Sequence, residues 1–100
     1  MGMNMKDSDI VIHVRFLQTN EGGRGAPIVT DQLSPILEHA GKYYACRLLL
    51  QDVGTILPGD IVDVPLKLLR PDLVKSLMKV GDSIKIRELG TIAEGTIKEL

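Results

Sequence analysis

The chain has few aromatic residues and almost no cysteine. Its 100 residues include one phenylalanine, two tyrosines, no tryptophan and one cysteine. A single cysteine excludes an internal disulfide, so the sequence fits a reducing compartment and we expect a cytoplasmic protein. Cys46 lies in a strand-like segment with no histidine near it in sequence. We therefore interpret it as a small buried apolar side chain and not as a reactive thiol.

The sequence also lacks an excess of either charge. Twelve basic and thirteen acidic residues give a formal net charge of −1. Such a balance provides no long-range positive field for nucleic acid, so any RNA contact is expected to be local. A protein partner is therefore favoured over RNA.

No stretch is apolar enough for a membrane helix, which needs roughly 18 consecutive apolar residues. Residues 1–9 contain two aspartates and lack the apolar core of a secretory signal. We expect these residues to form a flexible N-terminal segment and residues 10–100 to form one domain, with no membrane contact.

The motifs of common catalytic and cofactor sites are missing as well. The glycines at 22, 23 and 25 follow neither nucleotide-binding pattern and do not open a helix, so no cofactor is expected. His13 and His39 are far apart, and no cysteine or carboxylate pair has the spacing of metal ligands. We expect both histidines to be solvated or at the core edge, and we predict a protein that is not an enzyme and holds no metal. A hydrolase that uses surface carboxylates is disfavoured.

Short segments of alternating apolar residues make up most of the chain. Residues 10–17, 43–50 and 61–69 alternate with period two, and residues 84–98 form a predicted hairpin. Residues 26–29 are predicted as a further short strand, and residues 36–39 as either a helical turn or a strand. Five or six such strands predict an all-β fold, a small closed antiparallel barrel of about six strands. The predicted interior residues are Ile12, Val14, Phe16, Val62, Val64, Leu66, Ile84, Ile86 and Ile97.

Two interruptions of the strand pattern carry their own predictions. Pro65 is predicted to point outward, and because proline has no N–H, that side of its strand should be an edge, a bulge or a gap. Residues 72–80 bring apolar side chains together at i,i+4 spacing, which predicts a short helical insert that plugs one end of the barrel.

Basic residues fall on the outward side of the alternating segments. Strands that are adjacent in space would assemble these residues into a local basic patch, whereas the alternative is an ordinary surface of mixed charge. The outward basic residues are Arg15, Arg47, Lys67, Lys85 and Arg87.

The candidates for partner binding are Arg24, Arg47, Lys85 and Arg87. Two roles are open for Arg24, which the glycine-rich turn displays. It fixes the turn by bonding a neighbouring loop, or it grips an acidic group of a partner.

Several motifs in fixed order resemble a known family. These are Glu21-Gly22-Gly23-Arg24 with Pro27, then residues 57–60 (LPGD), Arg70-Pro71, and residues 86–88 (IRE) with Gly95. Their order and spacing resemble the third, C-terminal β-barrel domain of elongation factor Tu over about residues 10 to 100.

The resemblance implies a six-stranded antiparallel barrel. In the full factor this barrel packs on a second barrel and a GTPase domain, and it contacts aminoacyl-tRNA and the exchange factor Ts. This chain departs from the family pattern at Leu89-Gly90, where the family has an arginine, and at Glu94, where it has alanine. The GTPase domain and second barrel are absent from the sequence, so delivery of tRNA does not carry over.

We therefore expect a non-catalytic module that binds a macromolecular partner, and the translation apparatus is one source of such a partner. The alternative is a small protein neutraliser, an immunity protein or inhibitor that acts by protein–protein binding.

Overall fold

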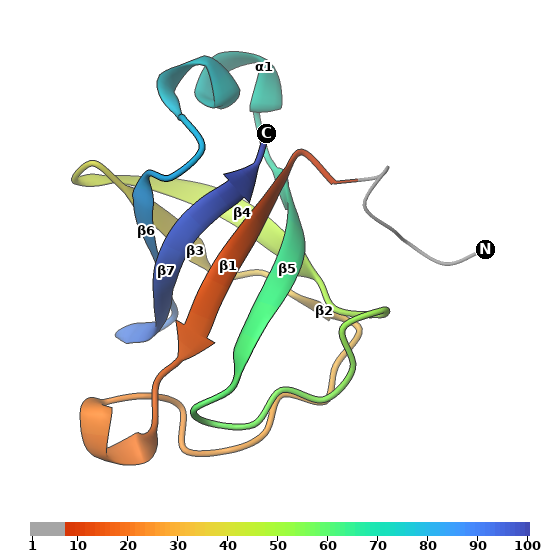
Figure 1. Ribbon diagram of the computed structural model, residues 1–100, viewed down its shortest axis with the longest axis vertical. Helices are drawn as coiled ribbons and strands as arrows, with labels where there is room; N and C mark the ends of the chain where they lie inside the picture. Colours follow the sequence, from red (N-terminus) through yellow and green to blue (C-terminus); the bar gives the residue numbers. More distant parts are fainter. Residues whose placement is uncertain (1–7) are drawn as a thin grey trace.

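A computed structural model describes residues 8–100 of the chain (Figure 1). Of the predicted flexible segment 1–9, the first seven residues lie outside this description. Asp9 is bonded to the barrel, because its N–H donates to the Leu66 carbonyl at 2.8 Å and its carboxylate accepts from the Leu68 N–H at 2.7 Å. The strands are β1 (Ile10–Phe16), β2 (Gln32–Leu33), β3 (Ile36–His39), β4 (Lys42–Leu49), β5 (Ile61–Leu68), β6 (Ser83–Arg87) and β7 (Thr91–Glu99).

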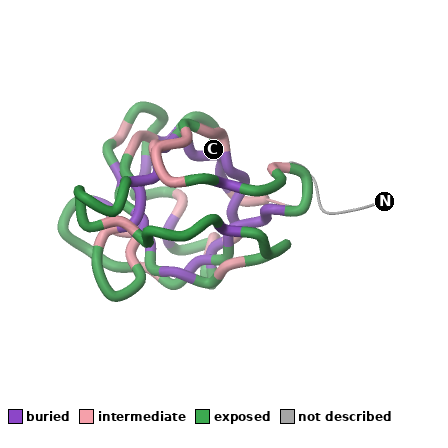
Figure 2. Tube along the Cα trace, turned by 90° about the horizontal axis from the view of Figure 1, so that it is seen from below, coloured by how far each residue is buried: buried purple, intermediate pink, exposed green. Residues whose placement is uncertain are grey.

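The strands form one antiparallel sheet that closes on itself. Hydrogen-bonded neighbours follow the order β2-β4-β3-β6-β7-β1-β5, and an additional pairing of β4 with β5 completes the cylinder. Six strands build the barrel wall and β2 is an extra short strand beside β4, so the predicted closed barrel is confirmed. Figure 2 shows exposed loops around the buried segments of the wall.

The interior is filled as the alternation predicts. Eight of the nine predicted interior residues are buried, and the ninth, Val62, is partly buried against the same core. Each fully buried aliphatic side chain stabilises the fold by about 1.5–3 kcal/mol relative to an exposed one. Residues 36–39 are a strand and not a helical turn, and this strand pairs with both β4 and β6.

The predicted strand at residues 26–29 is wrong. The structure has only an isolated bridge there, in which Ile28 and Ile56 exchange backbone hydrogen bonds of 2.8 and 3.0 Å. Gly25 has a φ of 78° and Pro27 cannot donate, so the backbone before Ile28 does not continue a ladder.

Pro65 lies where the β4–β5 ladder stops. This ladder runs from Cys46 opposite Leu68 to Leu48 opposite Leu66. The predicted gap beside the proline is therefore present. Pro65 lies opposite Val11, two positions from the outward pair His13 and Asp63, so it is on the outward side as predicted. Both Pro65 and Val11 are nevertheless buried there.

The helical insert consists of α1 (Pro71–Val74) and the 3₁₀ turn η3 (Lys75–Leu77), at one end of the barrel (Figure 1). Val74 and Met78 belong to the core cluster. Leu73 and Leu77 face the solvent, each 57% exposed. The insert therefore covers the barrel end with one apolar side only.

Strands β1 and β7 approach closely at Gly95, which lies opposite Val14. A Cβ atom at this position would lie 1.9 Å from the His13 carbonyl oxygen and 2.7 Å from the Val14 Cα. Both are backbone atoms of β1, so they cannot move aside as a side chain can. The pairing of β1 with β7 therefore requires glycine at position 95.

We predict that Gly95→Ala lowers the free energy of unfolding by about 3 kcal/mol or more, because the methyl group forces the two strands apart. In a domain of this size the melting temperature should fall by roughly 12 °C or more. Gly90→Ala is the matched control, since no atom lies within 4 Å of its added Cβ. Equal melting temperatures for the two variants would contradict the close approach.

Candidate binding surface on the barrel wall

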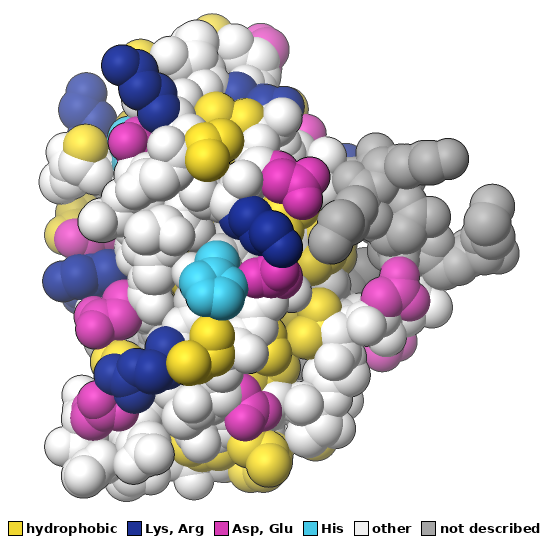
Figure 3. Space-filling view, in the orientation of Figure 1, with side chains coloured by type: hydrophobic (Ala, Val, Ile, Leu, Met, Phe, Trp, Pro, Cys, Tyr) yellow, Lys and Arg dark blue, Asp and Glu magenta, His cyan; other side chains and the backbone are white. Residues whose placement is uncertain are grey.

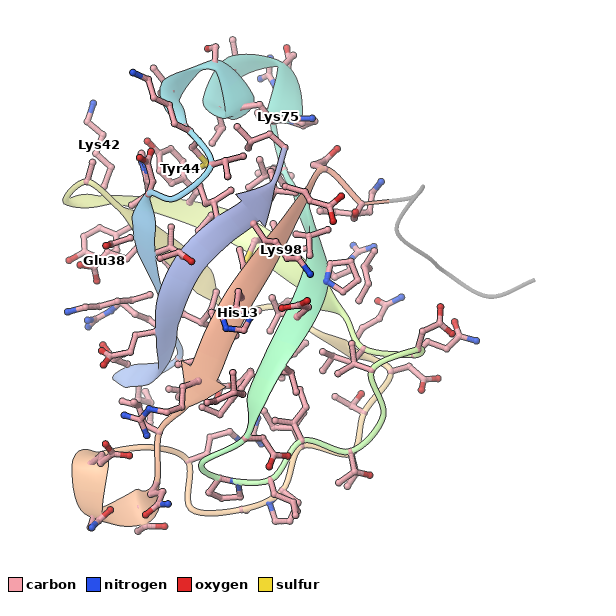
Figure 4. All side chains as sticks on the ribbon, in the orientation of Figure 1. His13, Glu38, Lys42, Tyr44, Lys75 and Lys98 are labelled. Atoms are coloured by element: carbon pink, nitrogen blue, oxygen red, sulfur yellow. The ribbon has the colours of Figure 1, made fainter. Side chains whose placement is uncertain are left out.

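The outward positions of three neighbouring strands form one continuous surface, here called the β3–β4–β6 face. Register places Tyr43 opposite Glu38 and Glu38 opposite Lys85 in one row. A second row holds Ala45, Ile36 and Arg87, and Arg47 follows two positions further along β4. The face therefore consists of Ile36, Glu38, Tyr43, Ala45, Arg47, Lys85 and Arg87. Figure 4, which is viewed from the side of β7, β1 and β5, labels Glu38 near its left edge.

Arg87 is held in place by three neighbours. Its Nη1 lies 3.5 Å from the Glu38 carboxylate and 3.5 Å from the Thr91 hydroxyl oxygen. Its guanidinium carbon lies 5.8 Å from the centre of the Tyr43 ring, within cation–π range. These contacts order the side chains of Arg87 and Tyr43 before any partner binds, so less conformational entropy is lost on association.

The face combines exposed apolar groups with positive charge. Tyr43 is 61% exposed and Ile36 is 37% exposed. Three cations, Arg47, Lys85 and Arg87, share the face with one carboxylate, Glu38, so its net charge is +2 although the whole chain carries −1. Tyrosine and arginine, with tryptophan, are enriched where binding energy concentrates in protein interfaces.

The predicted basic residues gather only in part. Three of them lie on the face, Lys85 and Arg87 on β6 and Arg47 on β4. Arg15 is separated from Lys85 by Glu94 on the intervening β7. The row across the wall thus alternates in charge beyond Lys85. A single patch of all five predicted basic residues is therefore wrong, because Glu94 separates Arg15 from the others. The fifth residue, Lys67, lies opposite Arg47 on β5.

Arg24 lies away from the face, against the β6–β7 hairpin. Its Nη1 is 3.4 Å from the Glu88 carboxylate, and both side chains are about one-third exposed, at 35% and 33%. This contact agrees with the turn-fixing role considered for Arg24. An exposed pair of this kind stabilises by no more than about 1 kcal/mol.

The shorter bonds of the glycine-rich turn belong to Glu21, a residue of the sequence motif for which no bonding role was predicted. Its carboxylate accepts two hydrogen bonds of 2.8 Å from Arg15 and one of 2.9 Å from the Gln18 N–H. These bonds lower the pKa of Glu21 to about 2.

The backbone of the same turn packs closely at Gly23. A Cβ atom at this position would lie 2.1 Å from the Leu17 carbonyl oxygen.

The opposite wall, formed by β7, β1 and β5, carries interspersed charges of both signs (Figure 3). At its centre the His13 Nδ1 lies 2.6 Å from the Asp63 carboxylate, which also accepts from Lys98 (Figure 4). The Lys98 hydrogen bond, with that of His13, lowers the pKa of Asp63, and the pKa of Lys98 is raised in turn. These charges neutralise one another within the wall.

His39 lies at the core edge, in agreement with one of its predicted environments. Its side chain is 8% exposed, and its Nε2 lies 2.8 Å from the Asp82 carboxylate. That carboxylate also accepts the Lys79 N–H at 2.9 Å, and the pKa of Asp82 is lowered, first by His39 and then by this backbone bond. The pair therefore ties β3 to the turn before β6.

Cys46 is buried in the core, as predicted. Its thiol donates to the Pro35 carbonyl at 3.6 Å, and burial raises its pKa to about 12. The thiolate form is therefore negligible near neutral pH, and the side chain acts as an apolar group.

In comparisons with known proteins, no family model matches the chain and no curated protein matches it. Within residues 8–100 no cluster of three or more histidine, cysteine or acidic side chains is positioned to hold a metal ion. No helix in the same part of the chain is both long enough and apolar enough to cross a bilayer.

We predict that Glu21→Gln destabilises the protein more than Arg24→Ala does, because it weakens three short hydrogen bonds instead of one long ion pair. The pKa of Glu21 falls from an ordinary 4.5 to about 2 on folding. A lowered pKa stabilises the fold above the unfolded value, and this contribution is lost as pH falls.

Chemical unfolding should therefore show the largest difference between wild type and Glu21→Gln above pH 4.5, shrinking as pH falls toward 2. Arg24→Ala should cost less than about 1 kcal/mol. A larger cost for Arg24→Ala, or a pH-independent Glu21 effect, would contradict this assignment.

Proposed function

We propose that the protein is a non-catalytic binding module that holds an acidic segment of a partner protein on the β3–β4–β6 face. The observation that carries this proposal is the ordered group of Arg87, Glu38 and Tyr43, with the Tyr43 ring 61% exposed. A fixed arginine beside an exposed aromatic ring matches the composition of energetic centres in protein interfaces.

A protein partner fits this face better than RNA does. Single-stranded RNA binders stack successive bases on several aromatic rings along a positive groove. The face has one aromatic ring, and the Glu38 carboxylate at its centre would repel phosphates. The apolar side chains of Ile36 and Tyr43 complement apolar side chains of a partner, and the surrounding cations complement its carboxylates.

We also propose a relationship to the third barrel domain of elongation factor Tu, in a cytoplasmic setting. The six-stranded closed barrel supports this relationship at the level of fold. Two residues that carry the resemblance have structural roles in this barrel. Glu21 holds the glycine-rich turn, and Gly95 permits the close approach of β1 and β7. These two residues therefore support a shared fold. The proposal about the partner rests on the β3–β4–β6 face alone.

The test compares two exposed positions of nearly equal burial. Tyr43→Ser changes the face, whereas Ile61→Ser changes a residue that is 62% exposed on β5, outside the face. Tagged protein is incubated with a lysate of the source cells, with and without nuclease, and retained proteins are quantified and their affinities measured.

We expect an acidic protein to be retained by wild type and by Ile61→Ser, with or without nuclease. Tyr43→Ser should weaken its binding about 30-fold, as the loss of about 2 kcal/mol at an interface centre implies. Retention that disappears with nuclease would identify RNA and overturn the proposal. Equal effects of the two variants would show that the partner binds elsewhere.

A further inference from the structure

A hollow of about 310 Å³ opens on the barrel wall beside the junction of β4 and β5. Its cause is the interruption between β2 and β3, where Ser34 and Pro35 belong to neither strand. Ser34 occupies the outward position beside Arg47, and its short side chain does not fill the space there. The hollow is lined by Ser34, Arg47, Lys67 and the apolar Leu69, and no carboxylate lines it.

Two cations face each other at this hollow. Arg47 and Lys67 are direct cross-strand partners, so their Cβ atoms lie about 4.5–5.5 Å apart. Like charges in this arrangement destabilise a sheet. Arg47 has no ion pair within residues 8–100, whereas Lys67 has an interaction of its own within the protein. Arg47 is therefore the cation whose donors are available.

We propose that this hollow is a binding site for a phosphate group. The guanidinium of Arg47 presents paired N–H donors that match two phosphate oxygens, and the Lys67 ammonium adds a second positive charge. The Ser34 hydroxyl is a further donor at the rim. A doubly charged phosphate placed between the two cations also removes their mutual repulsion. The hollow shares Arg47 with the β3–β4–β6 face, but Tyr43 and Arg87 do not line it, so phosphate binding does not require a partner on that face.

The hollow has room for more than the ion. A liquid water occupies about 30 Å³, so a volume of about 310 Å³ also admits the first atoms of a phosphate ester. Leu69, 74% exposed at the edge, offers an apolar contact for such a substituent. Free phosphate and a phosphate monoester share the same recognition chemistry here, and the experiment separates them.

The test is a titration of the ¹⁵N-labelled full chain with inorganic phosphate, at constant ionic strength maintained with chloride. Amide signals of residues 45–47 and 67–69 should shift together and saturate, with a dissociation constant on the order of millimolar. Arg47→Gln should weaken binding at least about tenfold, and Arg47→Lys should restore part of it. Lys85→Gln, a charge change outside the hollow, should bind as wild type does.

A parallel titration with O-phosphoserine identifies the source of the phosphate. Tighter binding than inorganic phosphate supports a monoester, and equal or weaker binding supports the free ion. The spectrum of each variant confirms that it is folded. Shifts that stay linear up to about 50 mM, that spread over all basic residues, or that persist in Arg47→Gln would overturn the site.

Discussion

The structure depends on the seam where β4 meets β5, because this pairing alone turns the sheet into a cylinder. Three residue pairs make the seam, with Arg47 and Lys67 in the middle. Each of the other five junctions of the barrel wall pairs four to six residues. The junction of β1 with β7 depends on the bare backbone of Gly95. A like-charge pair at the centre of the shortest junction is unfavourable, so an anion bound there would also stabilise closure.

Strand order and register fix which outward side chains become neighbours. Tyr43 and Arg87 lie on different strands, and the intervening β3 supplies the Glu38 carboxylate that bonds Arg87. The opposite wall pairs its charges internally through Asp63. The β3–β4–β6 face is therefore positive and partly apolar although the whole protein is nearly neutral. Net charge alone does not describe what such a surface can bind.

Period-two alternation predicted the fold and nearly all of the interior, because an alternating strand has one possible buried side. It also placed three cations of the face, Arg47, Lys85 and Arg87, on the outside. It did not predict the contact of Tyr43 with Arg87, because that contact requires the register and order of three strands. The bonding role of Glu21 was not predicted for a related reason. Its partner Arg15 lies on the preceding strand, and only the turn of the backbone brings the two side chains together. Parity placed Pro65 on the outward side, but it did not predict that Pro65 and its cross-strand partner Val11 are buried there.

Native-state amide hydrogen exchange tests the closed barrel most directly. Leu69 donates to Ala45 across the seam at 3.3 Å, and hydrogen-bonded pairs alternate along an antiparallel ladder, so Arg47 and Lys67 form the next such pair. Their amides should exchange only through global unfolding, with the same free energy as the amide of Leu17, which donates to Ile92 at 2.9 Å. Exchange at the seam with a much smaller free energy would show that the sheet opens there and would contradict the closed barrel.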